Sequence, residues 1–222
     1  LEAIECRDAL LTKRADGSFA EARWPVAEFI VGNPPFLGAS RMLGGLGEDY
    51  ASQLRRLYSG RVPGFADLVC YWFEKARESL IASRTQRVGL VATNSISGGE
   101  NRFVLDSIAE SLRIFLAYSD EAWTVEGADV RVAIVGFGSD LKEQQYLNGK
   151  PVTELNADLE SGPKLISAAR LKDNKGVAFE GTKKYGDFEV SGELARSWLM
   201  EPTNVNGLSN ADVLKPWLNG RD

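Results

Sequence analysis

The chain has 222 residues, of which 44% are hydrophobic and 26% are charged. This composition is typical of a globular protein and excludes an intrinsically disordered chain. The formal net charge of −5 argues against a protein that grips a phosphate backbone over its whole surface, so any nucleic-acid contact must be local or made by a partner domain. With no histidine and only Cys6 and Cys70, the chain lacks the residues for a disulfide framework, a zinc site or a histidine-dependent triad.

No apolar run is long enough to span a bilayer, and the first residues do not form a basic stretch followed by an apolar signal core. We therefore expect a cytoplasmic protein. The chain begins with Leu1 rather than methionine, inside a strand-like pattern. From this start we expect an excised piece of a longer polypeptide.

Hydrophobic periodicity and turn residues predict the elements of the chain in order. In the first half they predict a short strand over 2–6, a polar loop over 12–20 with a turn at Asp16-Gly17, a buried strand over 28–32, a helix over 48–58 in a Gly- and Arg-rich loop, and an amphipathic helix over 66–82. In the second half they predict a buried strand over 87–93, a helix over 101–111, strands over 114–118 and 130–137, a hairpin over 141–156, and a helix over 191–199.

The order strand, helix, strand, helix, strand, strand is typical of an α/β fold. We expect a mostly parallel sheet with an antiparallel last strand. The pattern weakens beyond about Gly138, and we place a domain boundary after residue 158. Residues 159–222, with a tail rich in Asn, Gly and Pro, are interpreted as a small connector region.

The sequence Asn33-Pro34-Pro35-Phe36 follows the strand predicted over 28–32. An exocyclic amine of adenine or cytosine is a poor nucleophile, because its lone pair is delocalised into the ring. The Asn33 side-chain oxygen and the Pro34 carbonyl can together accept both N–H bonds of such an amine and draw it toward tetrahedral geometry. Phe36 offers a flat face on which an unstacked base can lie. The alternative interpretation is a simple turn after a strand, since Asn and Pro favour turns.

Residues 29–36 (FIVGNPPF) resemble the fourth motif of S-adenosylmethionine-dependent DNA amino-methyltransferases. Residues 62–77 look like the helix that follows this motif, and 87–99, with its VATNSI run, is similar to the next strand and loop. Together these segments resemble the large bacterial restriction-modification and phage-defence methyltransferases of class I. The resemblance covers residues 1–158 well and the remainder loosely.

The resemblance implies the C-terminal half of a Rossmann-like methyltransferase sheet. It implies S-adenosylmethionine as the cofactor, double-stranded DNA as the partner, and the N6 of a flipped adenine as the methyl acceptor, with cytosine N4 as the alternative. It also implies that Asn33, Pro34, Pro35 and Phe36 are the catalytic residues.

Three further roles follow from the resemblance. Asp8 matches the acid that binds the adenine end of the cofactor, although a helix cap or loop acid has the same appearance. Trp123, seven residues ahead of Val130, is the candidate for stacking on the flipped base from the other side, with a core tryptophan as the alternative. Phosphate contacts near the flipped base, or ordinary surface charge, are expected of four arginines in the Gly-rich loop: Arg41, Arg55, Arg56 and Arg61.

Asp67 and Glu74 share one face of the helix predicted over 66–82. We interpret this face as solvated, with a functional pair of carboxylates as the alternative. The sequence departs from the resemblance at its start, because nothing before Asn33 matches the Gly-rich turn that holds the methionine part of the cofactor. We therefore expect the chain alone to bind S-adenosylmethionine weakly and to methylate nothing. We also expect a sheet edge left exposed, which promotes self-association.

Two other functions fit the same motif. One is methylation of a protein glutamine or another planar nitrogen, and the other is a non-catalytic DNA-binding scaffold. The tail favours a DNA enzyme, because it resembles the start of a target-recognition domain with six basic residues: Lys164, Arg170, Lys172, Lys175, Lys183 and Lys184.

Overall fold

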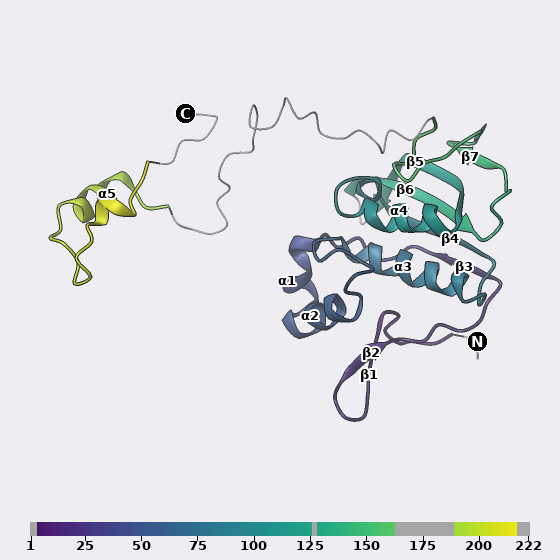
Figure 1. Cartoon of the computed structure of the whole chain (residues 1–222), viewed down its shortest axis with the longest axis horizontal. Coiled ribbons are helices and arrows are strands. Elements are labelled where there is room, and N and C mark those ends of the chain that lie inside the picture. Colours follow the sequence, from purple (N-terminus) through teal and green to yellow (C-terminus); the bar gives the residue numbers. More distant parts are fainter. Residues whose placement is uncertain (1–3, 126–127, 163–188, 217–222) are drawn as a thin grey trace. The chain divides into compact units, whose positions relative to one another are not determined.

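The computed structural model describes residues 4–125, 128–162 and 189–216. The chain divides into two compact units, Leu1–Ser167 and Ala168–Asp222 (Figure 1). No helix in the described ranges is long and apolar enough to cross a bilayer. The six basic residues of the tail named above all lie outside the described residues.

A six-stranded sheet with the order β3-β4-β6-β5-β7-β8 forms the first unit. Its strands are β3 (Phe29–Gly32), β4 (Arg87–Thr93), β5 (Arg113–Val125), β6 (Ala128–Gly138), β7 (Gln145–Leu147) and β8 (Lys150–Val152). The β3–β4 and β5–β7 pairs are parallel, and the β4–β6, β5–β6 and β7–β8 pairs are antiparallel. The expected α/β class is confirmed, but the expectation of a mostly parallel sheet is wrong. The sheet is mixed because β6 folds back along β5 and inserts between β5 and β4.

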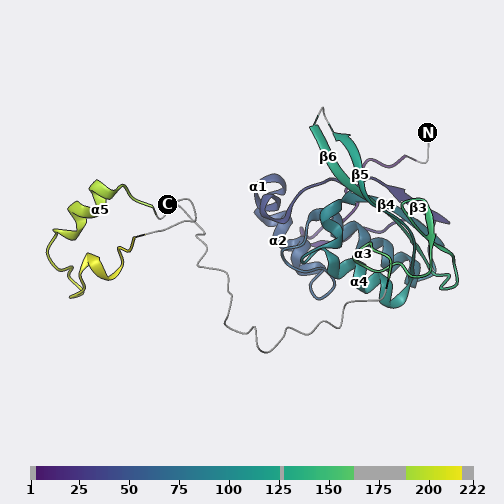
Figure 2. The same ribbon diagram turned by 90° about the horizontal axis from the view of Figure 1, so that it is seen from above.

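Helices α3 (Leu68–Ile81) and α4 (Arg102–Ser111) lie side by side across one face of this sheet (Figures 1 and 2). Both confirm helices predicted from the sequence. The core forms beneath them, where alternate residues of β4 are buried and the ring of Phe73 on α3 stacks on Phe137 of β6 with centroids 5.9 Å apart. This packing fixes β4, and through β4 it fixes the neighbouring strand β3.

β3 is an edge strand, paired to β4 alone in the part of the chain that the structure describes. Its position confirms the predicted strand, but the expectation that this strand is buried is wrong. Phe29 and Val31 are 58% and 86% exposed. The reason is the period of two along a strand: Ile30 faces the helices, whereas Phe29 and Val31 point to the opposite face.

The N-terminal part differs from its prediction. Residues 4–6 form no strand, and residues 1–3 lie outside the described ranges. The expected turn at Asp16-Gly17 is present, and Gly17 has a φ of +84°. It closes an antiparallel hairpin of β1 (Leu11–Lys13) and β2 (Phe19–Glu21) where a polar loop was predicted. The hairpin forms because apolar residues at its ends pack inward: Leu11 is 3% exposed, and Phe19 lies edge-on to Tyr50.

The segment between β3 and α3 carries a 3-10 turn (Ala39–Arg41), α1 (Met42–Leu46) and α2 (Glu48–Leu57), of which α2 confirms the helix expected there. The predicted hairpin over 141–156 is also confirmed, because β7 and β8 pair antiparallel.

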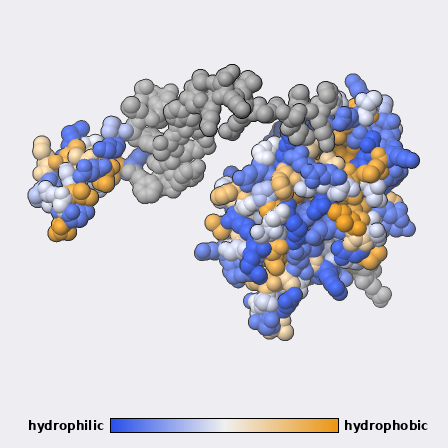
Figure 3. Space-filling model, viewed as in Figure 1, coloured by the Kyte–Doolittle hydropathy of each residue, from blue (hydrophilic) through white to orange (hydrophobic). Residues whose placement is uncertain are grey.

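The described part of the second unit contains α5 (Gly192–Leu199) and a 3-10 turn (Asn210–Asp212). α5 confirms the expected helix. The Ser191 hydroxyl caps it by accepting the Leu194 N–H at 3.2 Å. No side chain in 189–216 is buried, and hydrophobic residues lie at the surface of this part (Figure 3).

Candidate active site

Two loops meet at one edge of the sheet. Residues 33–38 follow β3, and a 3-10 turn (Asn94–Ser97) follows β4. Because β3 and β4 are parallel neighbours, their carboxyl ends open at the same edge. Open α/β sheets bind ligands at this kind of edge.

The segment from Asn33 to Phe36 leaves β3 in an open conformation. Pro34 is buried, Phe36 is half-buried, and Asn33 and Pro35 are exposed. Within the residues that the structure describes, the side-chain amide of Asn33 has no hydrogen-bond partner. Its oxygen is therefore available to a substrate.

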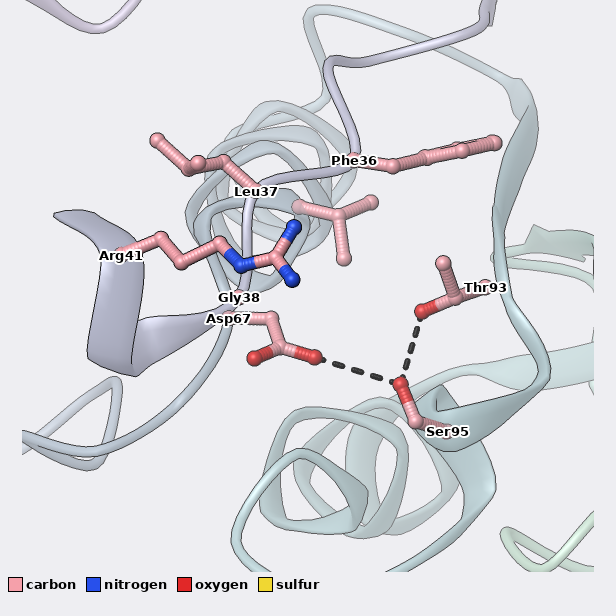
Figure 4. A pocket seen from close by; sticks show the side chains of 8 residues that line it. Phe36, Leu37, Gly38, Arg41, Asp67, Thr93 and Ser95 are labelled. Atoms are coloured by element: carbon pink, nitrogen blue, oxygen red, sulfur yellow. Dashed lines mark hydrogen bonds between the residues drawn. The ribbon is translucent and has the colours of Figure 1, made fainter. Parts of the chain in front are cut away.

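A pocket of about 250 Å³ lies beside Phe36 (Figure 4). It is lined by Phe36, Leu37, Gly38, Arg41, Asp67, Val69, Thr93 and Ser95. This volume is below the range usual for drug-sized ligands, so the pocket suits one small planar group better than a whole cofactor. No group of three metal-binding side chains occurs among the described residues.

Asp67, which the sequence interpretation placed on a solvated helix face, is a half-buried junction at this pocket. Its Oδ1 accepts the Ala39 N–H at 2.9 Å. Its Oδ2 accepts from Asn101 Nδ2 at 2.7 Å and from Ser95 Oγ at 3.2 Å. The Ser95 hydroxyl also lies 2.7 Å from Thr93 Oγ1, so the polar groups on this wall are connected (Figure 4).

Glu74, assigned to the same solvated face, is completely buried. Its carboxylate accepts two hydrogen bonds from Arg77, at 2.7 and 2.9 Å, and lies 3.9 Å from Arg61. The solvated interpretation is therefore wrong for both acids. The reason is that the loops after β3 and β4 contact Asp67, and that Arg61, from the segment before α3, lies close to Glu74.

Of the four arginines expected near phosphates, the structure brings Arg41 to the pocket. Arg61 forms ion pairs with Glu21 and Glu78, and its guanidinium lies 4.7 Å from the Tyr58 ring centroid. The other two lie on α2: Arg56 donates to Gln53, and Arg55 is half-buried. Arg41 is exposed, and its guanidinium points into the pocket (Figure 4).

Asp8 does not line this pocket. It is exposed, and its Oδ1 accepts the backbone N–H groups of Leu10 at 2.8 Å and Leu11 at 3.0 Å. Burial raises the pKa of Tyr50, and a hydrogen bond to Asp8 raises it further. A carboxylate offers about four acceptor positions, so Asp8 retains capacity for one more donor. It thus fits contact with the amine of a cofactor adenine, while also acting as a loop acid.

A second hollow has a volume of about 470 Å³, and residues next to Asp8 in the sequence help to line it. It is lined by Glu5, Arg7, Ala9, Trp24 and Pro25. Trp24 is held there by donating its indole N–H to the Ala9 carbonyl at 2.7 Å. This larger hollow shares no lining residue with the pocket beside Phe36.

Trp123 lies at the same edge of the sheet as the two loops. Thr93, at the carboxyl end of β4, pairs with Val132 of β6. Trp123 pairs with Val130, which is two residues closer to the start of β6. At about 3.3 Å per residue, Trp123 stands roughly 7 Å beyond the end of β4. It is 37% exposed and does not line the pocket.

Sequence reasoning missed Thr93, Ser95 and Asn101 as parts of this edge. A signal was present for the first two, since polar residues directly after a strand parallel to β3 must share its edge. Asn101 carried no such signal, because it lies at the start of α4 and reaches the pocket wall through its contacts with Asp67 and Ser95.

Comparisons with known proteins indicate the family of the chain. The family model described as "MmeI, DNA-methyltransferase domain" matches residues 3–148. Among solved structures, the type IIL restriction-modification enzyme MmeI in complex with DNA is similar at 27% identity with a TM-score of 0.49, over 62% of this chain and 20% of that one. A type I restriction-modification assembly is similar at 15% identity with a TM-score of 0.36, over 54% of this chain and 23% of that one.

No curated protein matches the chain. The chain spans about a fifth of the length of the solved chains to which it is similar. The family match covers well over half of the 222 residues, including both loops at the carboxyl edge of the sheet. The resemblance drawn from residues 29–36 is thereby confirmed, and the chain belongs to the family of MmeI DNA-methyltransferase domains.

Proposed function

We propose that this chain is the catalytic half of an enzyme that transfers a methyl group from S-adenosylmethionine to the N6 of an adenine swung out of double-stranded DNA, as part of a restriction-modification or defence system. The observation that carries the proposal is the unpartnered Asn33 amide at the carboxyl end of β3, next to a pocket with an aromatic wall. Family membership supports the cofactor and the DNA substrate.

In this proposal Asn33 and Pro34 act on the amine directly. The Asn33 side-chain oxygen and the Pro34 carbonyl each accept one N–H, which localises the nitrogen lone pair and directs it away from the ring plane. The cofactor supplies an electrophilic methyl group on a sulfonium. No general base is needed before attack, because the amine attacks as a neutral group and loses its proton afterwards.

The rigidity of the segment matters as much as its acceptors. Both prolines have a fixed φ and lack an N–H, so the carbonyl between them is held in one direction. Burial of Pro34 adds to this restraint. Methyl transfer requires close alignment of the three reacting atoms, and an acceptor that moved would lose that alignment.

The remaining roles are assigned by position. Phe36 is proposed to stack on one face of the flipped base, and Trp123, from the β5–β6 hairpin, on the other. Arg41 is proposed to contact a phosphate near the flipped nucleotide, since it is exposed at the pocket and its guanidinium has no partner among the described residues. Asp8 is proposed to accept a hydrogen bond from the cofactor adenine.

For the whole protein, we propose that residues 1–158 are the catalytic half of the methyltransferase domain. Residues 159–222 are proposed to form a connector toward a target-recognition domain. We also propose that the chain by itself binds S-adenosylmethionine weakly and methylates nothing, because no residues before Asn33 match the Gly-rich turn that holds the methionine part of the cofactor. Isothermal calorimetry on residues 1–222 tests this, and tight stoichiometric binding would refute it.

The decisive experiment replaces Asn33. We expect Asn33→Ala to lower kcat for methyl transfer to DNA by about 100-fold or more, as loss of one aligned polar group in an active site usually does. Asn33→Asp keeps an acceptor oxygen and should retain more activity than Asn33→Ala. Asn206→Ala, an exposed asparagine of the second unit, serves as the control.

The assay is transfer of a labelled methyl group by the protein in its DNA-methylating form, followed by mass spectrometry of the digested nucleosides. N6-methyladenine is the expected product. N4-methylcytosine would leave the mechanism intact and overturn the adenine assignment. An unchanged rate in Asn33→Ala would overturn the mechanism itself, and methylation of a glutamine peptide instead of DNA would favour a protein substrate.

A further inference from the structure

Asp67 occupies the N-cap position of α3 but does not cap it. At this position an aspartate side chain normally accepts backbone N–H groups of its own helix. Here the side chain makes no such bond. It turns instead toward the loop after β3 and toward the start of α4, where it accepts from Ala39, Ser95 and Asn101. The Asp67 carboxylate therefore binds neighbouring segments of the chain instead of its own helix.

The contact with Asn101 is reciprocal. Asn101 Oδ1 accepts the Asp67 backbone N–H at 2.8 Å, and its Nδ2 donates to Asp67 Oδ2 at 2.7 Å. Asn101 is 8% exposed and Asp67 is half-buried, so the pair is partly shielded from water. Asn101 thus accepts one hydrogen bond from Asp67 and donates another to it, and the two bonds together fix the orientation of both side chains.

The other carboxylate oxygen holds the segment that follows the catalytic residues. Asp67 Oδ1 accepts the Ala39 N–H at 2.9 Å, and the adjacent Leu68 N–H donates to the Leu37 carbonyl at 2.9 Å. Two hydrogen bonds thus fasten residues 37–39 to the start of α3, directly after Phe36. On its other side, the segment is anchored by the pairing of β3 with β4.

These end anchors are important because the middle of the segment makes few hydrogen bonds: within the described residues, the Pro35 carbonyl accepts the Leu37 N–H at 3.2 Å. Pro34 and Pro35 have no N–H to donate, and the Asn33 side chain has no partner within the described residues. The alignment of the two acceptor oxygens is therefore set by β4 at one end and by Asp67 at the other.

We propose that Asp67 is a positioning residue for methyl transfer: together with Asn101 it holds residues 37–39, and through them the Asn33 and Pro34 oxygens, in the geometry of the reaction. This inference rests on the proposed function. It assigns Asp67 no contact with the reacting atoms.

The test exploits the reciprocity of the pair. Asp67→Asn has one acceptor oxygen, so it can serve Ala39 or Asn101 but not both. Asn101→Asp places two carboxylates against each other. In the double variant, the new amide at position 67 accepts from Ala39 through its oxygen and donates through its nitrogen to the new carboxylate at position 101. The pair is thus rebuilt with its polarity reversed and its charge unchanged.

We expect each single variant to lower kcat by about 10- to 100-fold, the usual cost of a displacement near 1 Å at a reacting centre. Affinities for S-adenosylmethionine and DNA should change by less than about threefold, because the loss is in alignment and not in binding. The double variant should regain about tenfold of the lost rate, since residues in one network couple strongly. The matched control is Asp106→Asn, which also removes a carboxylate. Asp106 lies on α4 and pairs with Arg102, so its loss should leave kcat unchanged.

Unchanged kcat in Asp67→Asn would overturn the inference, and so would a double variant no faster than the slower single variant. A double variant that fails to fold would equally contradict the reciprocal pair. Asn33→Ala, measured alongside, separates the two levels: if it retains activity while Asp67→Asn loses it, the proposed mechanism fails and Asp67 acts in another way.

Discussion

Phe36 provides a quantitative test of base stacking at the pocket. Its half-buried ring forms one wall on the side of Thr93, and the Leu37 side chain extends in the opposite direction (Figure 4). Phe36→Ala removes this wall without removing a polar group. Stacking of a base on an aromatic ring contributes about 1–3 kcal/mol, and since each 1.4 kcal/mol is tenfold, the flipped state should be depopulated by roughly 5- to 140-fold.

The loss should appear in kcat/KM for DNA methylation and in the fluorescence of a 2-aminopurine placed at the target position, which brightens when the base leaves the stack. Phe36→Tyr keeps the flat face and should retain most of both signals. Phe103→Ala, a 46% exposed aromatic on α4, is the control for loss of a surface ring.

The reasoning would be refuted if Phe36→Ala and Phe103→Ala gave the same kcat/KM and the same fluorescence. A fall in kcat/KM with normal fluorescence would also contradict it, because the stacking contribution is assigned to holding the base out of the helix and not to the methyl-transfer step.

Two other predictions concern charge and association. Arg41→Gln should weaken DNA binding and reduce the slope of log K against log salt by about one, because one phosphate contact is lost. The control is Arg56→Gln, because the Arg56 guanidinium is already bound to Gln53 and its loss should leave the slope unchanged. Filter-binding or anisotropy titrations measure both slopes. Val31→Lys should suppress the self-association that we expect through the free edge of β3, because a charge on an exposed strand discourages strand pairing; light scattering that shows a strictly monomeric parent at high concentration would contradict this.

The sequence predicted most elements of the fold, because each rests on a local pattern. The apolar spacing in 66–82 and the apolar run in 87–93 are properties of neighbouring residues, and both elements appear close to their expected bounds. The order of strands is not local. β6 lies between β4 and β5 because of side-chain packing against α3, such as the stack of Phe73 on Phe137, and no short-range pattern encodes that insertion.

The candidate site divides in the same way. Asn33-Pro34-Pro35-Phe36 was identified from a contiguous motif, and the structure places it at the expected end of a strand. The roles proposed for these residues stay predictions. Asp67 and Asn101 are 34 positions apart in the chain, and the isolated helix pattern led to the wrong environment for Asp67. Contacts of that kind depend on how loops fold over a helix end, which neither periodicity nor spacing describes.

The unpaired side of β3 and the contacts of Asp67 both affect how firmly the tip of β3 is held. A strand bonded on one side only is less restrained than a central strand, yet its tip carries the two oxygens whose direction decides the rate. In the part of the chain that the structure describes, the restraint comes from β4 and from the Asp67–Asn101 pair. Since alignment errors near 1 Å cost roughly 100-fold in rate, a strand added to the free edge of β3 would increase methyl transfer, because β3 would then be hydrogen-bonded on both sides. Activity and monomeric behaviour should therefore rise together, because both depend on what the edge of β3 is paired with.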